Sequence, residues 1–222
     1  METVSIPGRN GDLHRWDGSY NNREIAGECF LLDHAAVRNI DVINAWLISE
    51  PGYFRFEDTT DSKHFMLARA VKGIPRNMKA GMLNSFELVF DAMPERYLKS
   101  GDRYLDIYNG VGYSGDAINP TVYPSSPLLK IVVEPGKQYK VYFNKGGESI
   151  GNLVVNSGEY EGAIFYDTKN DRAYSGGGEE LGGLVLAEGD LRIYPRSGSA
   201  RVIVWAANGN GRLSIMPRWW EI

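Results

Sequence analysis

The residues that could bind phosphate or do catalysis lie in glycine-rich loops and at scattered histidines. The first such loop, IPGRNGDL at residues 6–13, combines Arg9 with the turn dipeptides Pro-Gly and Asn-Gly. A phosphate-binding P-loop needs Gly-Lys-Ser/Thr at the opening of a helix, whereas Asp12 follows Gly11 here. The loop is therefore predicted to be a tight structural turn.

A second loop, GVGYSG at residues 110–115, satisfies the spacing Gly-x-Gly-x-x-Gly after the strand-like YLDIY. In a dinucleotide-binding fold this motif opens a helix whose N-terminus faces the pyrophosphate. The chain instead runs into Asn119-Pro120 and Pro124, which are incompatible with such a helix. The segment is predicted to be a linker.

Catalytic and metal-binding patterns are missing from the sequence. His14, His34 and His64 share no helical spacing and no cysteine pairs accompany them, so no zinc site is predicted. No Gly-x-Ser-x-Gly elbow occurs, and the single Cys29 lies in the apolar ECFLL, where a buried thiol is expected. The chain is predicted to be no enzyme and to bind no cofactor or metal.

Composition narrows the class of protein further. The chain has 222 residues, 43% of them hydrophobic, with 24 basic and 28 acidic residues and a net charge of −4. A duplex-binding protein normally carries a clustered basic face, so no specific nucleic-acid binding is expected. No stretch approaches the roughly eighteen apolar residues of a membrane-spanning helix, and the N-terminus lacks a signal-peptide pattern. A globular protein without membrane insertion is expected, folding in a reducing compartment.

The first half of the chain reads as a sheet that carries one helix. After the strand-like NREIAGECFLL, apolar residues recur at helical spacing from Ala36 to Leu47. Asp33 is a plausible N-cap, and Pro51 ends the helix. The segments YFRFED, KHFMLARAV and MLNSFELVFDA are predicted strands.

The second half is predicted to be an antiparallel β-sandwich. Gly, Pro, Asn and Ser dominate residues 109–127, and the domain boundary is placed there, giving domains 1–118 and 119–222. Short apolar strands then follow at regular intervals, which favours two packed sheets. They are LLKIVVE, QYKVYFN, GNLVVN, GAIFYD, RAYS, DLRIYP, ARVIVWAA and LSIMPRW.

Three tryptophans in this half have two interpretations. Trp205, Trp219 and Trp220 could stack on a sugar, or they could pack in a core or an interface, which is the commoner use in a strand. Adjacent strand residues point to opposite faces. One of Trp219 and Trp220 is therefore predicted to enter the sandwich core, while the other covers the first domain or the linker near residues 108–123.

The chain resembles the siphophage distal tail protein family over nearly its whole length. The opening and closing motifs are specific in combination, whereas residues 128–212 match mainly in strand character. Family members carry a further segment with a first strand before the opening motif, which is not found ahead of it here. The matching motifs, in chain order, are IPGRNGDL, DGSYNNREI, PGYFRFEDT, LARAV, KAG, FELVFDAMPERYLKSG and PRWWEI.

The resemblance implies a structural virion protein at the tip of a long non-contractile phage or prophage tail, assembled in the host cytoplasm. It implies a fold that is mainly β, with an N-terminal ring-forming sheet domain bearing one helix and a C-terminal galectin-like sandwich. The implied partners are five further copies in a homohexameric ring, the tail tube protein, the tail-associated tip protein, and receptor-binding or baseplate proteins.

Residues of the opening and closing motifs are the predicted contacts in assembly or between domains. The assembly or domain-interface candidates are Pro7, Gly8, Arg9, Gly11, Asp12, Arg218, Trp219 and Trp220. The alternative function is a carbohydrate-binding module whose C-terminal sandwich recognises host cell-wall polysaccharide, although the galectin sugar motif is not reproduced around VWAANGNGR.

Overall fold

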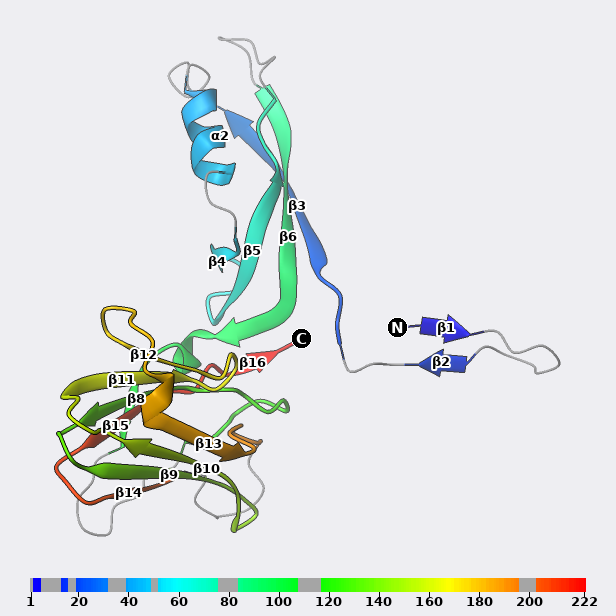
Figure 1. Cartoon of the computed structure of the whole chain (residues 1–222). Helices are drawn as coiled ribbons and strands as arrows, with labels where there is room; N and C mark the ends of the chain where they lie inside the picture. The colour runs from blue at the N-terminus through cyan, green and yellow to red at the C-terminus, as the bar shows by residue number, and fades with distance from the viewer. Residues whose placement is uncertain are drawn as a thin grey trace. The chain divides into compact units, whose positions relative to one another are not determined.

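The computed structural model contains two compact units (Figure 1). Contacts group residues 1–96 with Ile222 in the first unit and residues 97–221 in the second. The sequence placed the boundary later, between residues 118 and 119. The structure describes residues 2–4, 13–15, 19–31, 39–48, 52–75, 84–107, 117–195 and 203–222.

The first unit holds a two-stranded and a larger sheet. Strands β1 (Glu2–Val4) and β2 (Leu13–Arg15) pair antiparallel on either side of the predicted opening turn, which itself lies outside the described residues. The larger sheet has five strands: β16 (Trp220–Glu221), β6, β5 and β4 follow one another in this order, and β3 also pairs with β6, antiparallel from Arg23↔Ala92 to Leu31↔Asn84. Its other strands are β3 (Arg23–Leu31), β4 (Phe54–Phe56), β5 (His64–Lys72) and β6 (Asn84–Leu98).

The helix α2 (Ile40–Ile48) lies within the predicted helical segment and contacts β5. Ile40 is buried with Ile74 and Phe86, and Ile43 and Leu47 pack against this cluster. The predicted helical face is therefore confirmed for the described part of the helix. Asp33, Ala36 and Pro51 lie outside the described residues.

Strand β6 continues past the point where the sequence pattern stops. The predicted strand ends at Ala92, but β6 passes through Pro94 to Leu98. A proline has no backbone donor and is tolerated only where no ladder hydrogen bond is required. The β3 ladder ends at Ala92, before Pro94, and the Pro94 carbonyl accepts a hydrogen bond of 3.3 Å from the Arg23 guanidinium.

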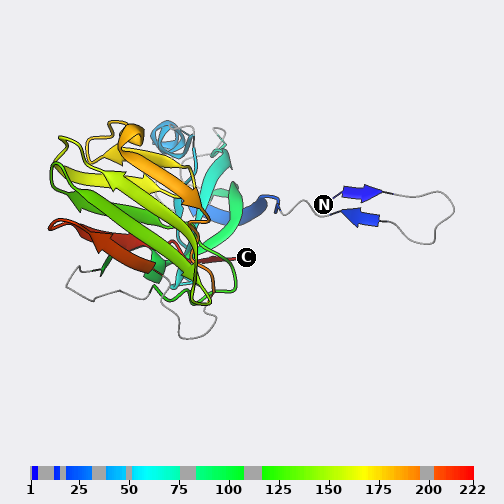
Figure 2. The same ribbon diagram turned by 60° about the horizontal axis from the view of Figure 1, so that its bottom comes forward.

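The second unit is an antiparallel β-sandwich of two sheets (Figures 1 and 2). One sheet has the order β13, β10, β9, β14, and the other has the order β12, β11, β8, β15, β7. Together with the single described helix, this confirms a fold that is mainly β. The strands are β7 (Leu105–Ile107), β8 (Leu128–Val133), β9 (Gln138–Lys145), β10 (Glu148–Asn156), β11 (Gly162–Asp167), β12 (Arg172–Ser175), β13 (Val185–Gly189), β14 (Ile203–Ala207), β15 (Arg212–Met216) and β16 (Trp220–Glu221).

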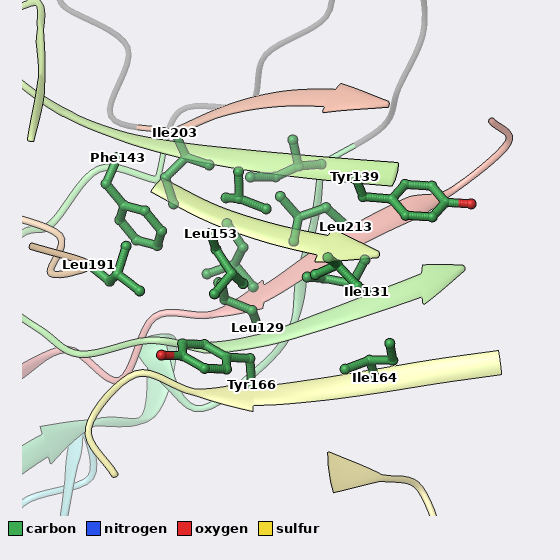
Figure 3. Close-up of a cluster of buried hydrophobic side chains, with 14 of the residues drawn as sticks. Leu129, Ile131, Tyr139, Phe143, Leu153, Ile164, Tyr166, Leu191, Ile203 and Leu213 are labelled. Atoms are coloured by element: carbon green, nitrogen blue, oxygen red, sulfur yellow. The ribbon is translucent and has the colours of Figure 1, made fainter. Parts of the chain in front are cut away.

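Alternating residues of both sheets form one apolar core (Figure 3). In β9, Tyr139, Val141 and Phe143 are fully buried, and the residues between them are half-buried. The period of two in the sequence thus marks the inward face of each strand. The sequence missed β13, and DLRIYP forms only isolated bridges, including Ile193 with Ser125.

The end of the predicted linker is an ordered part of the sandwich. Ala117 belongs to the core, and Asn119 is buried, donating from its side chain to the carbonyls of Tyr123 (2.8 Å) and Ile193 (3.0 Å). The Asn119 side-chain oxygen also accepts from the Thr121 amide and hydroxyl. Composition suggested a linker, but these hydrogen bonds pair the polar groups of the turn with one another and with the sandwich. Residues 108–116, including GVGYSG, lie outside the described residues.

Candidate functional site

Apolar residues lie on the outer face of α2 as well as on its inner face. Val42 and Trp46 lie four residues apart, so they share one face of the helix, opposite Ile40 and Leu47. Their exposed fractions are 68% and 76%. A helix of a globular protein normally turns its outer face to water with polar residues. We call Val42 and Trp46 the outer apolar pair; they are the candidate assembly site of the first unit.

Other large apolar side chains of the first unit are also exposed. Phe30, Ile48, Phe54 and Val71 each exceed 40% exposure, and they come from β3, α2, β4 and β5. Extended apolar exposure on a soluble protein marks surfaces that meet other molecules. Within the described residues, the first unit therefore leaves several large apolar side chains accessible to other molecules.

A two-way amide contact anchors α2. The Asn44 side chain donates to the Ile74 carbonyl at 2.9 Å and accepts from the Ile74 amide at 2.7 Å. A side chain on Gly73 would place its Cβ 2.7 Å from the Asn44 Oδ1, so this approach requires a glycine. The contact fixes the helix and so fixes the direction in which the outer apolar pair points.

Two carboxylates tie the strands of the first unit together. Asp91 on β6 accepts hydrogen bonds from Asn22 (2.9 Å), Tyr53 (2.9 Å) and Arg69 (3.0 Å). These bonds, led by that from Asn22, lower the pKa of Asp91. The His64 ring, at 2.8 Å, similarly lowers the pKa of Asp61. Asp91 lies inside the predicted strand, but its partners are far away in sequence, so no local pattern indicated them.

The structure brings together the C-terminal candidates Arg218, Trp219 and Trp220 within the second unit. Trp219 is 4% exposed and belongs to the sandwich core, and its carbonyl accepts from the Leu98 amide at 2.8 Å. Gly101 packs directly on it, because an added Cβ would lie 2.5 Å from the Trp219 backbone nitrogen. The closing motif therefore holds residues 98–101 against the sandwich.

Trp220 covers a different surface. Its ring stacks on Tyr123 with centroids 4.5 Å apart, and its indole N–H donates to the Pro124 carbonyl at 2.9 Å. This confirms the prediction that one tryptophan enters the core while the other covers a second surface, here the segment around Tyr123. A role for Arg218, Trp219 and Trp220 in assembly or at a domain interface stays a prediction. The other candidates, Pro7, Gly8, Arg9, Gly11 and Asp12, lie outside the described residues.

Arg218 forms the least exposed ion pair described in the second unit. Its guanidinium donates to both oxygens of Asp167, at 2.8 and 3.3 Å, from a backbone in the left-handed region (φ 56°). Burial raises the pKa of Asp167, but the hydrogen bonds and charge of Arg218 outweigh burial, so the pKa is lowered overall. Asp167 also accepts from the Lys169 amide and the Asn170 side chain, so Arg218 stabilises the turn after β11.

Titratable side chains meet in pairs and small hydrogen-bonded groups in the described part of the chain. No group of three or more His, Cys, Asp or Glu residues there could hold a metal ion. Cys29 is half-buried beside the small cluster of the first unit, so the thiol is less buried than predicted. The reason is that β3 is described with only one neighbour, β6, which leaves its side chains partly exposed. The side chain of Trp205 lies outside the described residues. No helix in the described ranges has the length and apolarity needed to cross a bilayer.

Comparison with known proteins gives matches only at the level of structure. No protein-family model and no curated protein sequence matches the chain. The SPP1 Dit protein, described as a hub of the adsorption apparatus in phages that infect Gram-positive bacteria, has the same fold: the TM-score is 0.68 at 14% identity, over 100% of this chain and 88% of that one. Chains of the phage P2 baseplate in its activated conformation, with Ca and with Sr, match with TM-scores of 0.52 and 0.50 at 12% identity, over 96% of this chain and 84% of theirs. The chain therefore has the fold of a siphophage distal tail hub protein.

Proposed function

We propose that this chain is a structural component of a siphophage or prophage tail tip, a distal tail hub that connects the tail tube to the tip or baseplate. The observation that carries the proposal is the fold match to SPP1 Dit over the whole chain, helix-bearing sheet and sandwich together. A match confined to the sandwich would support only a common β domain. The match of both units in one chain supports the hub role.

In this role the chain forms a homohexameric ring in the virion after assembly in the host cytoplasm. The ring contacts the tail tube protein and the tail-associated tip protein, and it anchors receptor-binding or baseplate proteins. The first unit is the ring-forming part, because it exposes the outer apolar pair and other large apolar side chains. Burying Val42 and Trp46 between copies would remove apolar area from water at about 25 cal/mol per Å².

The proposed role is non-enzymatic. The described residues hold no candidate metal cluster, and their perturbed carboxylates are each committed to structural hydrogen bonds. The net charge of −4 also suits a ring through which DNA passes without adhering. Turnover of peptidoglycan or teichoic acid by the purified chain, lost on substitution of a single carboxylate, would contradict this part of the proposal.

Light scattering coupled to size exclusion tests the assembly. We expect a hexamer at high protein concentration and ring-shaped particles by negative-stain electron microscopy. The double variant Val42→Ser/Trp46→Ser should shift the mass toward the monomer, because it removes apolar contact area without touching the inner face of α2.

The matched control is Leu186→Ser, which removes an exposed apolar side chain from β13 of the sandwich. This variant should assemble like the unaltered chain. A wild-type chain that stays monomeric at every concentration contradicts ring formation, and equal loss of assembly in both variants contradicts the assignment to the first unit.

A further inference from the structure

The second unit contains an open pocket of about 450 Å³ that the hub role does not use. This volume lies within the range of about 300 to 1,000 Å³ that is typical of small-molecule sites. One wall comes from the end of β11 and the turn after it, the other from the end of β13 and the residues that follow. Figure 3 shows two of the lining residues, Tyr166 and Leu191, toward the same end of the core. The lining residues are Ser126, Tyr166, Thr168, Lys169, Asp171, Ala187, Gly189, Asp190, Leu191 and Arg192.

The first wall holds a positioned carboxylate. Asp171 has a left-handed backbone (φ 51°), and its Oδ1 accepts a hydrogen bond from the Tyr166 hydroxyl. Burial, reinforced by this bond, raises the pKa of Tyr166, so the phenol remains a donor. The contacts described for Asp171 use only Oδ1, which leaves Oδ2 as an acceptor for a ligand. The turn that carries Asp171 and Lys169 is held by Asp167.

The second wall holds a positioned guanidinium. Arg192 donates from Nε (2.9 Å) and Nη2 (2.7 Å) to the two oxygens of Asp190, which also accepts from the Tyr194 hydroxyl at 2.6 Å. These bonds, chiefly those from Arg192, lower the pKa of Asp190 to about 2. The contacts described for Arg192 leave Nη1 as a donor. Gly189 (φ 75°) lets the end of β13 approach β10 closely, because an added Cβ would collide with the Ile150 carbonyl oxygen.

The charges of the two walls cancel. Lys169 is balanced by Asp171, and Arg192 by Asp190, so the pocket attracts neither an anion nor a cation as a whole. What remains is a set of donors and acceptors, and Ser126, Thr168 and the apolar Leu191 and Ala187 also belong to the lining. A ligand that alternates donors and acceptors over an apolar ring fits this lining best.

We propose that this pocket binds a neutral saccharide unit of one or two pyranose rings. The hydroxyls of the sugar would bond to Asp171 Oδ2, Arg192 Nη1 and Lys169, and its ring carbons would lie against Leu191. Tyr166 is almost completely buried and offers no ring face for stacking, so a single site binds weakly. In the proposed hexamer six such sites would act together and raise the overall avidity. Binding by one chain does not depend on the ring.

Ligand-observed saturation-transfer NMR on the full chain tests the proposal. The probes are glucose, galactose, N-acetylglucosamine, their β-linked disaccharides, and glycerol phosphate as an anionic probe. At least one neutral sugar should give a signal. Asp171→Asn and Lys169→Ala should each weaken its binding by about fivefold, the loss of one hydrogen bond. The control Lys140→Ala, on an outward position of β9, should bind like the unaltered chain.

Three results would each overturn the proposal. The first is the absence of any signal from a neutral sugar, and the second is binding of glycerol phosphate alone. The third is equal binding by Asp171→Asn and the unaltered chain. Circular dichroism melts of the variants show whether they are folded; both altered residues are exposed, so the melting temperature should not change. The oligomeric mass, measured on the same samples, separates failure of sugar binding from failure of ring assembly.

Discussion

The two units of this chain contrast in how they bury their apolar side chains. The sandwich encloses a continuous core in which Tyr139, Phe143 and Leu153 are completely shielded from water. The described cluster of the first unit consists of Ile40, Ile74 and Phe86 with a few half-buried neighbours. The described residues of the second unit thus form a continuous core, whereas those of the first unit leave several large apolar side chains exposed.

This difference suggests a division of labour. A unit with a complete core can keep its structure while its surface and pocket vary. A unit with an incomplete core gains stability when copies associate, because anything that binds only the folded state stabilises it. We therefore expect substitutions in the sandwich to act on the free energy of unfolding, and those in the first unit to act as much on association.

The largest expected effect comes from truncating one phenylalanine in each core. Phe143→Ala should cost about 3–5 kcal/mol, because the side chain is fully buried among residues of both sheets. Phe86→Ala should cost only about 2 kcal/mol, because its cluster is small and partly open. Denaturant unfolding, followed by circular dichroism at low protein concentration, measures both. Equal costs would remove the contrast between the two cores.

Glycine substitutions sharpen the comparison at close contacts. Gly101→Ala places a Cβ against the backbone of Trp219 and should cost about 3 kcal/mol, because a backbone in a packed core cannot yield. Gly73→Ala meets the Asn44 side chain, which can rotate away at the cost of its contact with Ile74, about 1 kcal/mol.

Thermal melts of the two variants should rank them in that order. Gly27→Ala is the control, since its Cβ would meet nothing within 4 Å. Chain entropy alone would leave Gly27→Ala neutral or slightly more stable. A loss of stability in Gly27→Ala as large as that in Gly101→Ala would show that the contact with the Trp219 backbone does not decide the cost.

Ion pairs add an effect on stability that depends on pH. Arg218→Ala should cost about 2 kcal/mol at neutral pH, because it removes a hydrogen-bond partner of the buried Asp167 carboxylate. Arginine and alanine bear the same backbone strain at this positive φ, so the strain does not contribute to the difference. Arg172→Ala, which breaks the exposed pair with Glu180, should lower the stability much less, because solvent screens the charges of an exposed pair.

The pH profile follows from the direction of the Asp167 shift. Because folding lowers the pKa of Asp167, the pair contributes fully above the ordinary carboxyl pKa of about 3.9. Its contribution is lost as the pH falls through the lower folded value. The stability difference between Arg218→Ala and the unaltered chain should therefore shrink in acid. A difference that is constant down to pH values near 2 would assign the effect to packing rather than charge.

Patterns along the chain located most of the strands and the helix. The strand-like segments contain β3, β4, β5 and most strands of the sandwich, and the alternation of Phe86, Leu88 and Phe90 marked β6. β13 was missed because its sequence, VLAEG, is short and ends in glycine, with only Val185 and Ala187 packed against the core. The predicted strand ended at Ala92, whereas β6 continues through Pro94 to Leu98. Pro94 lies beyond the end of the β3 ladder, and the sequence alone does not show where a neighbouring strand stops pairing.

By itself, then, the sequence determined a mainly β protein with a helix near its start, no local catalytic pattern, and a closing pair of tryptophans of which one had to be buried. Only the tertiary structure decided which groups meet: Arg218 with Asp167, Asn44 with Ile74, and the two walls of the pocket. It also decided that most of the surface of the outer apolar pair on α2 is exposed. The physical reason is that periodicity encodes which face of an element turns away from water, whereas hydrogen bonds and ion pairs join residues distant in sequence, and no local spacing specifies them.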